Sequence, residues 1–409
     1  MPGMRTPILS AAMVAALAMA GCASKGDAGA GATGSDKLVF GASLSLTGSL
    51  AREGNLTKEG YEVCREVINA KGGVAVGAKK LKLEIQFQDD TSKPDTAGQL
   101  IDQYNGNGIK LILGPYGSAT TEAAAAVIER NNQVMAEGAG ADDKIFAKGY
   151  KRTFAVLSPA KMYVASMVQA IDELVTPKPK TIAFVSADDG FSKTATAGGI
   201  AKAKELGYEV VAEEYVPNGT SDVSTALTKI KPKTPDVVLG SVHLAEGIAI
   251  IKQSKELGVA PQGFGETVAP PTPDFVKTLG ASAEGVLGSS QWTVTSRGGD
   301  TYFGTASDYA KTFAAQFGGR QPQYHGAEAT AACLAMVLAV QKAGTTEPDK
   351  VRDALAALDT PSFFGPLKFT DKGQNVTKPM AVIQIQGGKQ VTVWPKDSAE
   401  APLKWPGTH

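Results

Sequence analysis

The sequence predicts an α/β protein made of two doubly wound lobes, each with a mostly parallel sheet covered by helices. From Lys37 onward, short apolar segments typical of strands alternate with longer segments of helical periodicity. The number of strands that this alternation predicts is larger than is usual for one sheet, and a chain of 409 residues is long enough for two domains. We therefore expect two lobes rather than one extended sheet.

The first half of the folded part repeats a strand and a helix several times. Leu81, Leu83, Ile85 and Phe87 alternate strictly with other residues, which marks a strand, and Pro94 marks the start of a helix. The same criteria predict strands at 38–44, 81–87, 109–113 and 134–136, and helices at 56–70, 94–104 and 123–130.

The second half repeats the same pattern and then departs from it. We expect strands at 181–186, 208–215, 237–240, 263–265 and 285–292, and helices at 161–174, 222–231 and 245–257, with one more helix ending near 206. The tail carries two helices, at 326–343 and 349–358, and three strands, at 367–369, 380–386 and 390–394. Gly387-Gly388 between the last two strands predicts a β-hairpin.

The N-terminus has the features of an export signal. Arg5 precedes an apolar run at 8–20 that is too short to cross a bilayer as a stable helix. The run ends in Ala20-Gly21-Cys22, and small residues before a cysteine resemble a bacterial lipobox, although a plain secretory signal is the alternative. We expect residues 1–21 to be a lipoprotein signal peptide and 22–36 a flexible tether. The protein is then extracytoplasmic and lipid-anchored to a bacterial membrane through Cys22, facing the periplasm or the cell exterior.

Composition and motifs argue against several functional classes. Lysine plus arginine and aspartate plus glutamate both number 41, so the zero net charge offers no basic surface for a nucleic acid. The chain has three histidines, no Gly-x-Ser-x-Gly elbow, no metal-ligand motif and no P-loop. We expect no enzyme activity, no metal and no cofactor, and an ATPase in a separate subunit. Cys64 and Cys333 could form a disulfide or stay two buried thiols, and the sequence leaves both open.

Residues that directly follow the predicted strands are the candidates for a binding site, because ligands of open parallel sheets bind beyond the carboxyl ends of the strands. Glycines there permit a close approach of the backbone. Ser118 stands where a helix starts, which suits either capping or binding of an anion. Glu266 could pair with an ammonium group or simply face solvent. The candidates are Tyr116, Ser118, Ala139, Gly140, Phe191, His243 and Glu266.

Short segments spread over most of the chain carry a family resemblance. They are 41–48 (Gly-Ala-Ser-Leu-Ser-Leu-Thr-Gly), 69–73 (Asn-Ala-Lys-Gly-Gly), Asp89-Asp90, 114–118 (Gly-Pro-Tyr-Gly-Ser), 364–369 (Phe-Gly-Pro-Leu-Lys-Phe) and 387–391 (Gly-Gly-Lys-Gln-Val). In their order and spacing, the chain resembles the periplasmic Leu/Ile/Val-binding (branched-chain amino acid) family of ABC-transporter solute-binding proteins.

The resemblance implies a type I periplasmic binding protein fold, in which a three-strand hinge joins two lobes that close on a ligand. The hinge crossings should lie near 154–158, 289–292 and 363–369. Lobe 1 would then comprise 37–154 plus 293–363, and lobe 2 would comprise 155–292 plus 364–409.

The resemblance also implies roles for the candidate residues. Ser118 and the backbone around Ala139 should hold the α-carboxylate of an amino acid, and Glu266 should receive its ammonium group. Tyr116, Phe191 and His243 should shape the side-chain pocket. Three positions depart from the family pattern: Gly140 replaces a common threonine, His243 stands near a common tyrosine, and Glu53 lies in the first loop where an aromatic residue often covers the ligand.

The expected function is that of the solute-binding subunit of an ABC importer. It would capture a small amino acid or a similar molecule by hinge closure and deliver it to a membrane permease. Two alternatives remain open on sequence grounds: a sensor subunit with the same fold, and an importer for an amide, urea or an aromatic acid.

Overall fold

The computed structural model describes residues 36–407, and its first sheet is built from the N-terminal part of that range. The signal peptide, Cys22 and all but the last residue of the expected tether lie outside the described residues. Six strands form the sheet in the order β2-β3-β1-β4-β5-β6, with only β2 antiparallel to its neighbour. They are β1 (Lys37–Leu44), β2 (Val74–Val76), β3 (Lys79–Asp89), β4 (Leu111–Leu113), β5 (Val134–Glu137) and β6 (Thr153–Ala155).

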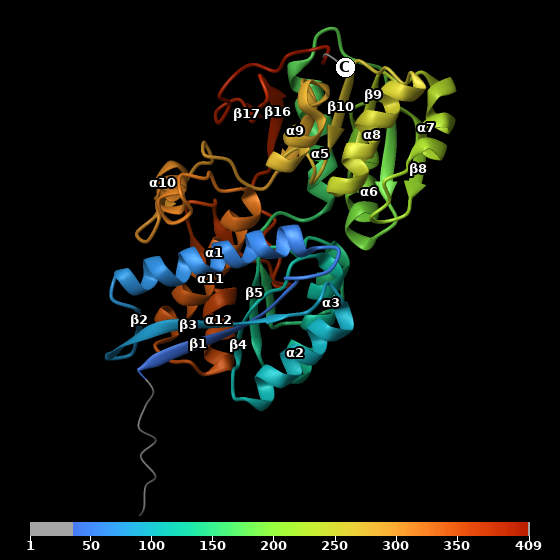
Figure 1. Ribbon diagram of the computed structural model, residues 1–409. Coiled ribbons are helices and arrows are strands. Elements are labelled where there is room, and N and C mark those ends of the chain that lie inside the picture. The colour runs from blue at the N-terminus through green and yellow to red at the C-terminus, as the bar shows by residue number, and fades with distance from the viewer. Residues whose placement is uncertain (1–35, 408–409) are drawn as a thin grey trace, which may run out of the picture. The chain divides into compact units, whose positions relative to one another are not determined.

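Helices cover both faces of the first sheet (Figure 1). Alternate residues of β1, from Leu38 to Leu44, belong to one core, while Val39 packs against another core that contains Tyr104. Gly41 is required on that second face, because a Cβ there would lie 2.9 Å from the Tyr104 ring. The helices of this half are α1 (Ala51–Ala70), α2 (Pro94–Gly106), α3 (Ser118–Arg130) and α4 (Asp143–Ala147).

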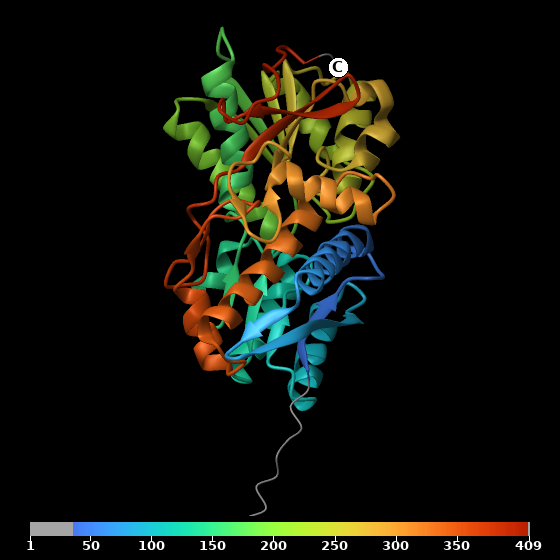
Figure 2. The ribbon, with the colours of Figure 1, turned by 90° about the vertical axis from the view of Figure 1, so that its left-hand side faces the viewer.

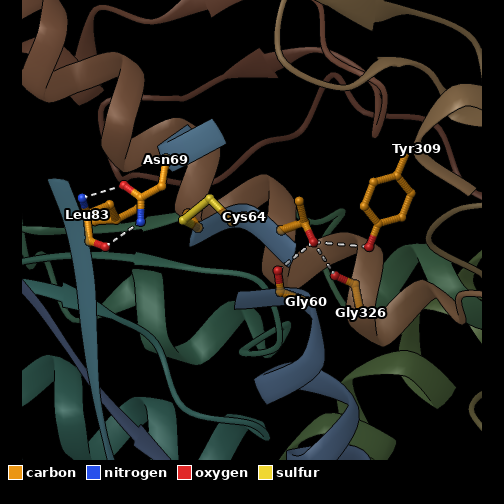
Figure 3. The surroundings of a disulfide bond; sticks show 8 residues. Gly60, Cys64, Asn69, Leu83, Tyr309 and Gly326 are labelled. Atoms are coloured by element: carbon orange, nitrogen blue, oxygen red, sulfur yellow. Dashed lines mark hydrogen bonds between the residues drawn. A yellow bond between two sulfur atoms is a disulfide. The ribbon is translucent and has the colours of Figure 1, made fainter. Parts of the chain in front are cut away.

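A helix from the far end of the chain completes the first core. In both views α11 (Tyr324–Ala343) lies beside α1 (Figures 1 and 2). A disulfide between Cys64 and Cys333 joins the two helices, which resolves the alternative that the sequence left open (Figure 3). Gly60 of α1 allows the close approach, because a Cβ there would lie 2.1 Å from the carbonyl oxygen of Gly326. Nearby, the Thr330 hydroxyl donates to the carbonyl oxygen of Gly60 at 2.8 Å.

The second sheet has seven strands in the order β17-β16-β11-β10-β9-β7-β8. Only β16 and β17 run antiparallel to their neighbours, and together they form the predicted hairpin. The strands are β7 (Thr181–Ala187), β8 (Glu209–Val216), β9 (Val237–Ser241), β10 (Gly263–Glu266), β11 (Leu287–Ser290), β16 (Ala381–Gln386) and β17 (Lys389–Trp394).

Helices also cover the second sheet on both faces. Residues of α5 (Lys161–Leu174) and α6 (Gly190–Glu205) share one core with β7 and β9. Residues of α7 (Ser224–Ile230), α8 (Leu244–Leu257) and α9 (Pro273–Leu279) share the opposite core. The two mostly parallel, doubly covered sheets confirm the predicted α/β class.

Three chain segments connect the sheets and are tied together by buried polar side chains. The Gln291 side chain bonds the backbone of Ser158 twice, accepting from its N–H at 3.0 Å and donating to its carbonyl oxygen at 3.1 Å. The Ser158 hydroxyl donates to the carbonyl oxygen of Lys378 at 2.9 Å. The Lys378 ammonium donates to Gln291 Oε1 at 3.0 Å, so one network spans all three segments.

The third connection lies further along the chain than the expected 363–369. Phe363, Phe364, Leu367 and Phe369 belong to the first core, and Phe369 packs edge-on against Phe154. The chain enters the second sheet only after Lys378, at β16. The apolar run at 363–369 therefore stays with the first sheet, because its aromatic side chains are buried there.

Two predicted elements of the tail are present: α12 (Pro348–Ala356) was expected at 349–358, and β15 (Leu367–Lys368) was expected at 367–369. Elements without a prediction include α10 (Ala306–Gln316), the short strands β12 (Gly299–Asp300), β13 (Gly304–Thr305) and β14 (Asp359–Thr360), and the 3-10 turns at Lys231–Lys233 and Gly280–Ala283. A capping box between Thr305 and Asp308 starts α10. Within residues 36–407, no helix is both long enough and apolar enough to cross a membrane.

Candidate functional site

A cavity of about 170 Å³ lies at the carboxyl ends of strands from both sheets. Ser118 and Ala139 line it from the first sheet, after β4 and β5, and Phe191 and His243 line it from the second, after β7 and β9. This is the place where open parallel sheets bind ligands. Tyr116 completes the set, so five of the seven candidate residues line one cavity.

Glu266 does not line this cavity, which differs from the expectation that it receives a ligand ammonium group. It is the last residue of β10, is fully buried, and neither carboxyl oxygen has a hydrogen-bond partner. A Cβ on Gly247 would lie 2.4 Å from Oε2, so the carboxyl group points at the start of α8. Burial raises the pKa of Glu266 well above 4.5, and the charge of Glu246 raises it further.

Gly140 lies beside the cavity lining, and the structure shows why no larger residue stands there. A Cβ at this position would lie 2.5 Å from Cγ2 of Thr121. The Thr121 hydroxyl donates to the carbonyl oxygen of Gly117 at 2.8 Å, which holds the side chain in that place. Thr121 therefore leaves no room at position 140 for the threonine that is common there in the family.

The backbone amides around Ala139 already have an acceptor inside the protein. Glu137 Oε2 accepts from the N–H groups of Ala139 at 2.8 Å and Gly140 at 2.6 Å. Glu137 is fully buried, and burial raises its pKa to about 7 against the opposing effect of these two bonds. The protein's own carboxyl group therefore occupies donors that we expected a ligand carboxylate to use.

The start of α3 keeps donors for an anion. Gly117 precedes the helix with a φ of +91°, and Ser118 follows as its first residue. The Ser118 hydroxyl oxygen accepts from the backbone N–H of Asp142 at 3.1 Å. The first N–H groups of a helix have no partner within it, so those of Ser118 and Ala119 remain suited to a negative group at the cavity.

An ion pair between Asp189 and His243 forms part of the wall contributed by the second sheet. Asp189 caps α6 and contacts His243 Nε2 at 3.1 Å. Burial lowers the pKa of His243, but the hydrogen bond and charge of Asp189 outweigh it and raise the pKa above 6.5. Burial opposes ionisation of Asp189 as well, yet the bond to His243 lowers its pKa below 3.8. Both pKa shifts favour the charged forms, a protonated His243 and an ionised Asp189.

Direct contacts link the two halves across the cavity mouth. Arg52 in the first turn of α1 pairs with Asp274 of α9 at 2.5 Å, with each side chain more than a third exposed. Asp142, which caps α4, accepts from the Thr194 hydroxyl of α6 at 2.8 Å. A Cβ on Gly190 would lie 2.6 Å from Asp142 Oδ2, so glycine permits this contact. The halves are therefore closed over the cavity.

Several lining residues were missed by reasoning from the sequence, among them Tyr163, Asp189, Tyr324 and Glu328. Tyr163, Tyr324 and Glu328 stand in the first or second turn of α5 and α11, while the search covered only residues after strands. Asp189 did follow a predicted strand, and its acidic type was the available signal. Glu53 also differs from expectation, because it is buried in the first turn of α1 rather than in a loop, and burial raises its pKa.

The hydroxyl and imidazole groups at the cavity are bonded to separate partners. Ser118 bonds the backbone of Asp142, and His243 bonds Asp189, so no hydrogen bond joins the hydroxyl to the imidazole. His325 lies behind the wall, stacked on Tyr324 at 3.9 Å, and burial lowers its pKa to about 3. Over residues 36–407, no group of three or more histidine, cysteine or acidic side chains is arranged to hold a metal ion.

The structure is that of a protein with two αβ halves and a cavity lined by the carboxyl ends of strands from both. The profile of the family described as "Periplasmic binding protein" matches residues 37–390, and the chain belongs to this family. Among curated relatives, the Leu/Ile/Val-binding protein homolog 8 of Brucella abortus is 24% identical over 383 residues, covering 90% of this chain and 92% of the relative. Homolog 7 of Brucella suis is also 24% identical, covering 93% and 96%.

Solved structures show the same fold. The leucine-binding protein LivK of Thermotoga maritima matches with a TM-score of 0.77 and 18% identity, covering 87% of this chain and 97% of LivK. The isoleucine complex of LivJ from Streptococcus pneumoniae matches with a TM-score of 0.74 and 21% identity, covering 87% and 97%. The predicted type I periplasmic binding protein fold is thereby confirmed.

Proposed function

We propose that this chain is the extracytoplasmic solute-binding subunit of an ABC importer, and that it captures a small amino-acid-like ligand by hinge closure. The observation that carries the proposal is the closed cavity, whose walls come from the carboxyl ends of both sheets. The three hinge segments, joined through Gln291, Ser158 and Lys378, allow the halves to move apart and return as units. Ligand that contacts both walls binds the closed form better and shifts the population towards it.

The location outside the cytoplasm has independent support. Disulfides persist in oxidising compartments, and the bond between Cys64 and Cys333 lies in the fully buried core of the first half. Acylation of Cys22 would hold the protein at a bacterial membrane, and the segment after it would let the folded part reach a permease. The permease and its ATPase are separate subunits, and the chain itself performs no catalysis.

Different parts of the cavity would bind different parts of an amino-acid-like ligand. Ser118 and the first amides of α3 would receive an anionic end. Aromatic side chains including Tyr116 and Phe191 would enclose the remainder, and His243 with Asp189 would form the polar part of the opposite wall.

Calorimetric titration of the protein with amino acids, amides, aromatic acids and organic amines tests this proposal. We expect one class of ligand to bind at a single site. Small-angle scattering should show a smaller radius of gyration in the bound state. Ala139→Trp, which fills the cavity, should abolish binding, whereas Ala78→Trp, at an exposed turn, should not. Failure of every class to bind, or turnover of a bound compound, would overturn the proposal.

A further inference from the structure

Four acidic side chains line the cavity, and two of them belong to ion pairs. The four are Glu122, Asp142, Asp189 and Glu328. Glu122 pairs with Lys148 at 2.8 Å, and both side chains are more than a third exposed. Asp189 pairs with His243 at 3.1 Å, and the pKa shifts of both groups favour their charged forms. These two carboxylates are therefore neutralised within the protein.

The other two carboxyl groups differ in how their oxygens are used. Oδ1 of Asp142 accepts from the N–H of Lys144 at 3.1 Å and from the hydroxyl of Thr194 at 2.8 Å. It therefore serves the start of α4 and the contact between the halves. Glu328 is 2% exposed, and its buried Oε2 has no hydrogen-bond partner among the described residues. A buried polar atom without a partner costs free energy, which a donor on a ligand would recover.

The first core fixes the position of Glu328. The residue lies in α11 four positions after Tyr324, so the two side chains share one face of the helix, and both line the cavity. Two residues further on, the Thr330 hydroxyl donates to a backbone carbonyl oxygen of α1 at 2.8 Å, and the disulfide joins the same two helices. The loop after β5 packs against this turn, because a Cβ on Gly138 would lie 2.7 Å from the carbonyl oxygen of Glu328. The carboxyl group is therefore presented to the cavity on a rigid support.

The groups around Glu328 keep its carboxyl group neutral until a cation arrives. Burial raises the pKa of Glu328 well above 4.5, the charge of Glu137 raises it further, and the ammonium of Lys378 opposes both. A positive group placed beside the carboxyl group favours its ionised form, and the proton then passes to solvent. The other titratable groups close enough to interact with Glu328 are Tyr61, Tyr116, Tyr163 and Tyr324.

The cavity then has complementary groups for both ends of an amino-acid-like ligand. Ser118 and the first amides of α3 suit a carboxylate. Glu328 supplies the acceptor for an amine that we expected from Glu266, which lies outside the cavity lining. The anionic and cationic ends of one ligand would therefore meet α3 and α11, which both belong to the first half.

We propose that Glu328 receives the ammonium group of an amino-acid-like ligand whose carboxylate lies at the start of α3. The inference rests on the proposed function and identifies the residue that makes the site selective for an amine. Compounds that keep the carboxylate and lack the amine are then weaker ligands.

Calorimetric titration with matched pairs of probes tests the inference. The pairs are L-alanine with propionate, L-leucine with 4-methylpentanoate, and L-phenylalanine with 3-phenylpropionate. Both members of a pair have the same side chain and carboxylate, so they differ only in the amine. We expect the amino acid of at least one pair to bind about tenfold to hundredfold more tightly than its des-amino partner, as hydrogen bonds to charged groups do.

Substitution of Glu328 assigns this difference to one residue. Glu328→Gln keeps the shape of the side chain and removes its charge, so it should weaken the amino acid about tenfold to hundredfold. The affinity for the des-amino partner should stay within about threefold of the parent protein. Glu266→Gln is the matched control, because it removes another fully buried carboxyl group with a raised pKa and should leave both affinities unchanged. Thermal unfolding reports whether both variants fold, and the comparison of the pairs in the parent protein does not depend on them.

Proton release is a readout that a purely structural role of Glu328 would not change. Titrations at pH 6 in buffers of different ionisation enthalpy count the protons exchanged on binding. Lys378, with a pKa of about 7, is mostly charged at this pH with or without ligand. We expect the amino acid to release up to about one proton from the parent protein and none from Glu328→Gln.

The outcomes separate the inference from the proposed function. Equal affinities within every pair that binds overturn the inference, and so does an equal loss of both members of a pair in Glu328→Gln. Absence of proton release from the parent protein, or a release that persists in Glu328→Gln, also overturns it. Binding confined to compounds without an amine overturns the inference and leaves the solute-binding function in place. Absence of binding by every compound in the wider panel overturns the proposed function itself.

Discussion

Replacing Glu266 by glutamine tests how a buried carboxyl group without partners affects this protein. The side chain is fully buried at the end of β10, and its two oxygens have no hydrogen-bond partner. Burial and the nearby Glu246 raise its pKa well above 4.5, so the folded state holds a proton that the unfolded chain gives up. Glutamine has nearly the same shape and carries no charge at any pH.

The magnitude follows from proton linkage. Above pH 4.5 the folded state binds more protons than the unfolded state, so the free energy of unfolding falls as pH rises. The fall is about 1.4 kcal/mol for each pH unit, until the folded carboxyl group ionises. Glu266→Gln removes this contribution, so the variant should gain stability relative to the parent protein as pH rises above 4.5. With an m-value of about 1–3 kcal/mol/M, each unit separates the urea midpoints by roughly 0.5–1.4 M.

Urea unfolding at a series of pH values, followed by circular dichroism, measures this difference. Glu256→Gln is the matched control, because Glu256 lies exposed on α8 and the substitution should leave the pH dependence of the midpoint unchanged. Ligand affinity of Glu266→Gln should equal that of the parent protein, since Glu266 does not line the cavity. A pH-independent difference in midpoints, or a strong loss of affinity, would refute this account of Glu266.

Three further predictions concern the cavity mouth, the disulfide and the hinge. Arg52→Ala removes the partly exposed ion pair with Asp274 and should weaken ligand binding about twofold to fivefold at low salt. The loss of affinity, measured by calorimetry, should be smaller at high salt, because salt screens exposed charges. An equal loss at both salt concentrations would exclude an electrostatic contribution. Reduction of the Cys64–Cys333 bond, which spans 269 residues, should lower the free energy of unfolding by about 4–6 kcal/mol in the loop-entropy account, and an unchanged urea midpoint after confirmed thiol release would contradict it. Burial lowers the pKa of Lys378 to about 7. Between pH 7 and 10.5 the free energy of unfolding of the parent protein should therefore rise by about 1.4 kcal/mol per pH unit relative to that of Lys378→Met, as measured by urea unfolding. The same pH dependence for both proteins would show that the lysine is not buried as described.

Local patterns were sufficient to predict most of the regular elements. The alternation in 81–87 lies within β3, where Leu83 and Ile85 are buried and Lys82 and Gln86 are exposed. The apolar segments 181–186 and 237–240 lie within β7 and β9, because continuous apolar segments fit a sheet that is covered on both faces. The helix α10 was missed because only a narrow set of its residues is buried and its start depends on a capping box. The third hinge segment was misplaced because an apolar run does not show which of two cores receives it.

The lining of the cavity was predictable to the extent that it follows the ends of strands. That rule identified Tyr116, Ser118, Ala139, Phe191 and His243, all of which line the cavity. It could not identify residues such as Tyr324, which reach the cavity from the start of a helix after the chain has crossed between the sheets.

Glu266 illustrates a different limit of the same reasoning. The residue lies within the final position of β10, and its side chain is directed at α8 rather than at the edge of the sheet. Successive side chains of a strand point to opposite faces, so a shift of one position along the strand moves a side chain from the cavity to the core. Only the three-dimensional packing of α8 against β10 settles which of the two applies.

Contacts between the halves set how strongly ligand binding must drive closure. A ligand's apparent affinity is reduced by the fraction of protein that is competent to bind, so every bond that favours closure also raises affinity. Arg52 and Asp274 are each more than a third exposed, and pairs of that kind contribute about 1 kcal/mol or less. The Arg52–Asp274 pair is therefore too weak to hold the halves together by itself. Under the proposed function, contacts of the ligand with both walls of the cavity would supply further free energy of closure, which would make closure depend on the ligand.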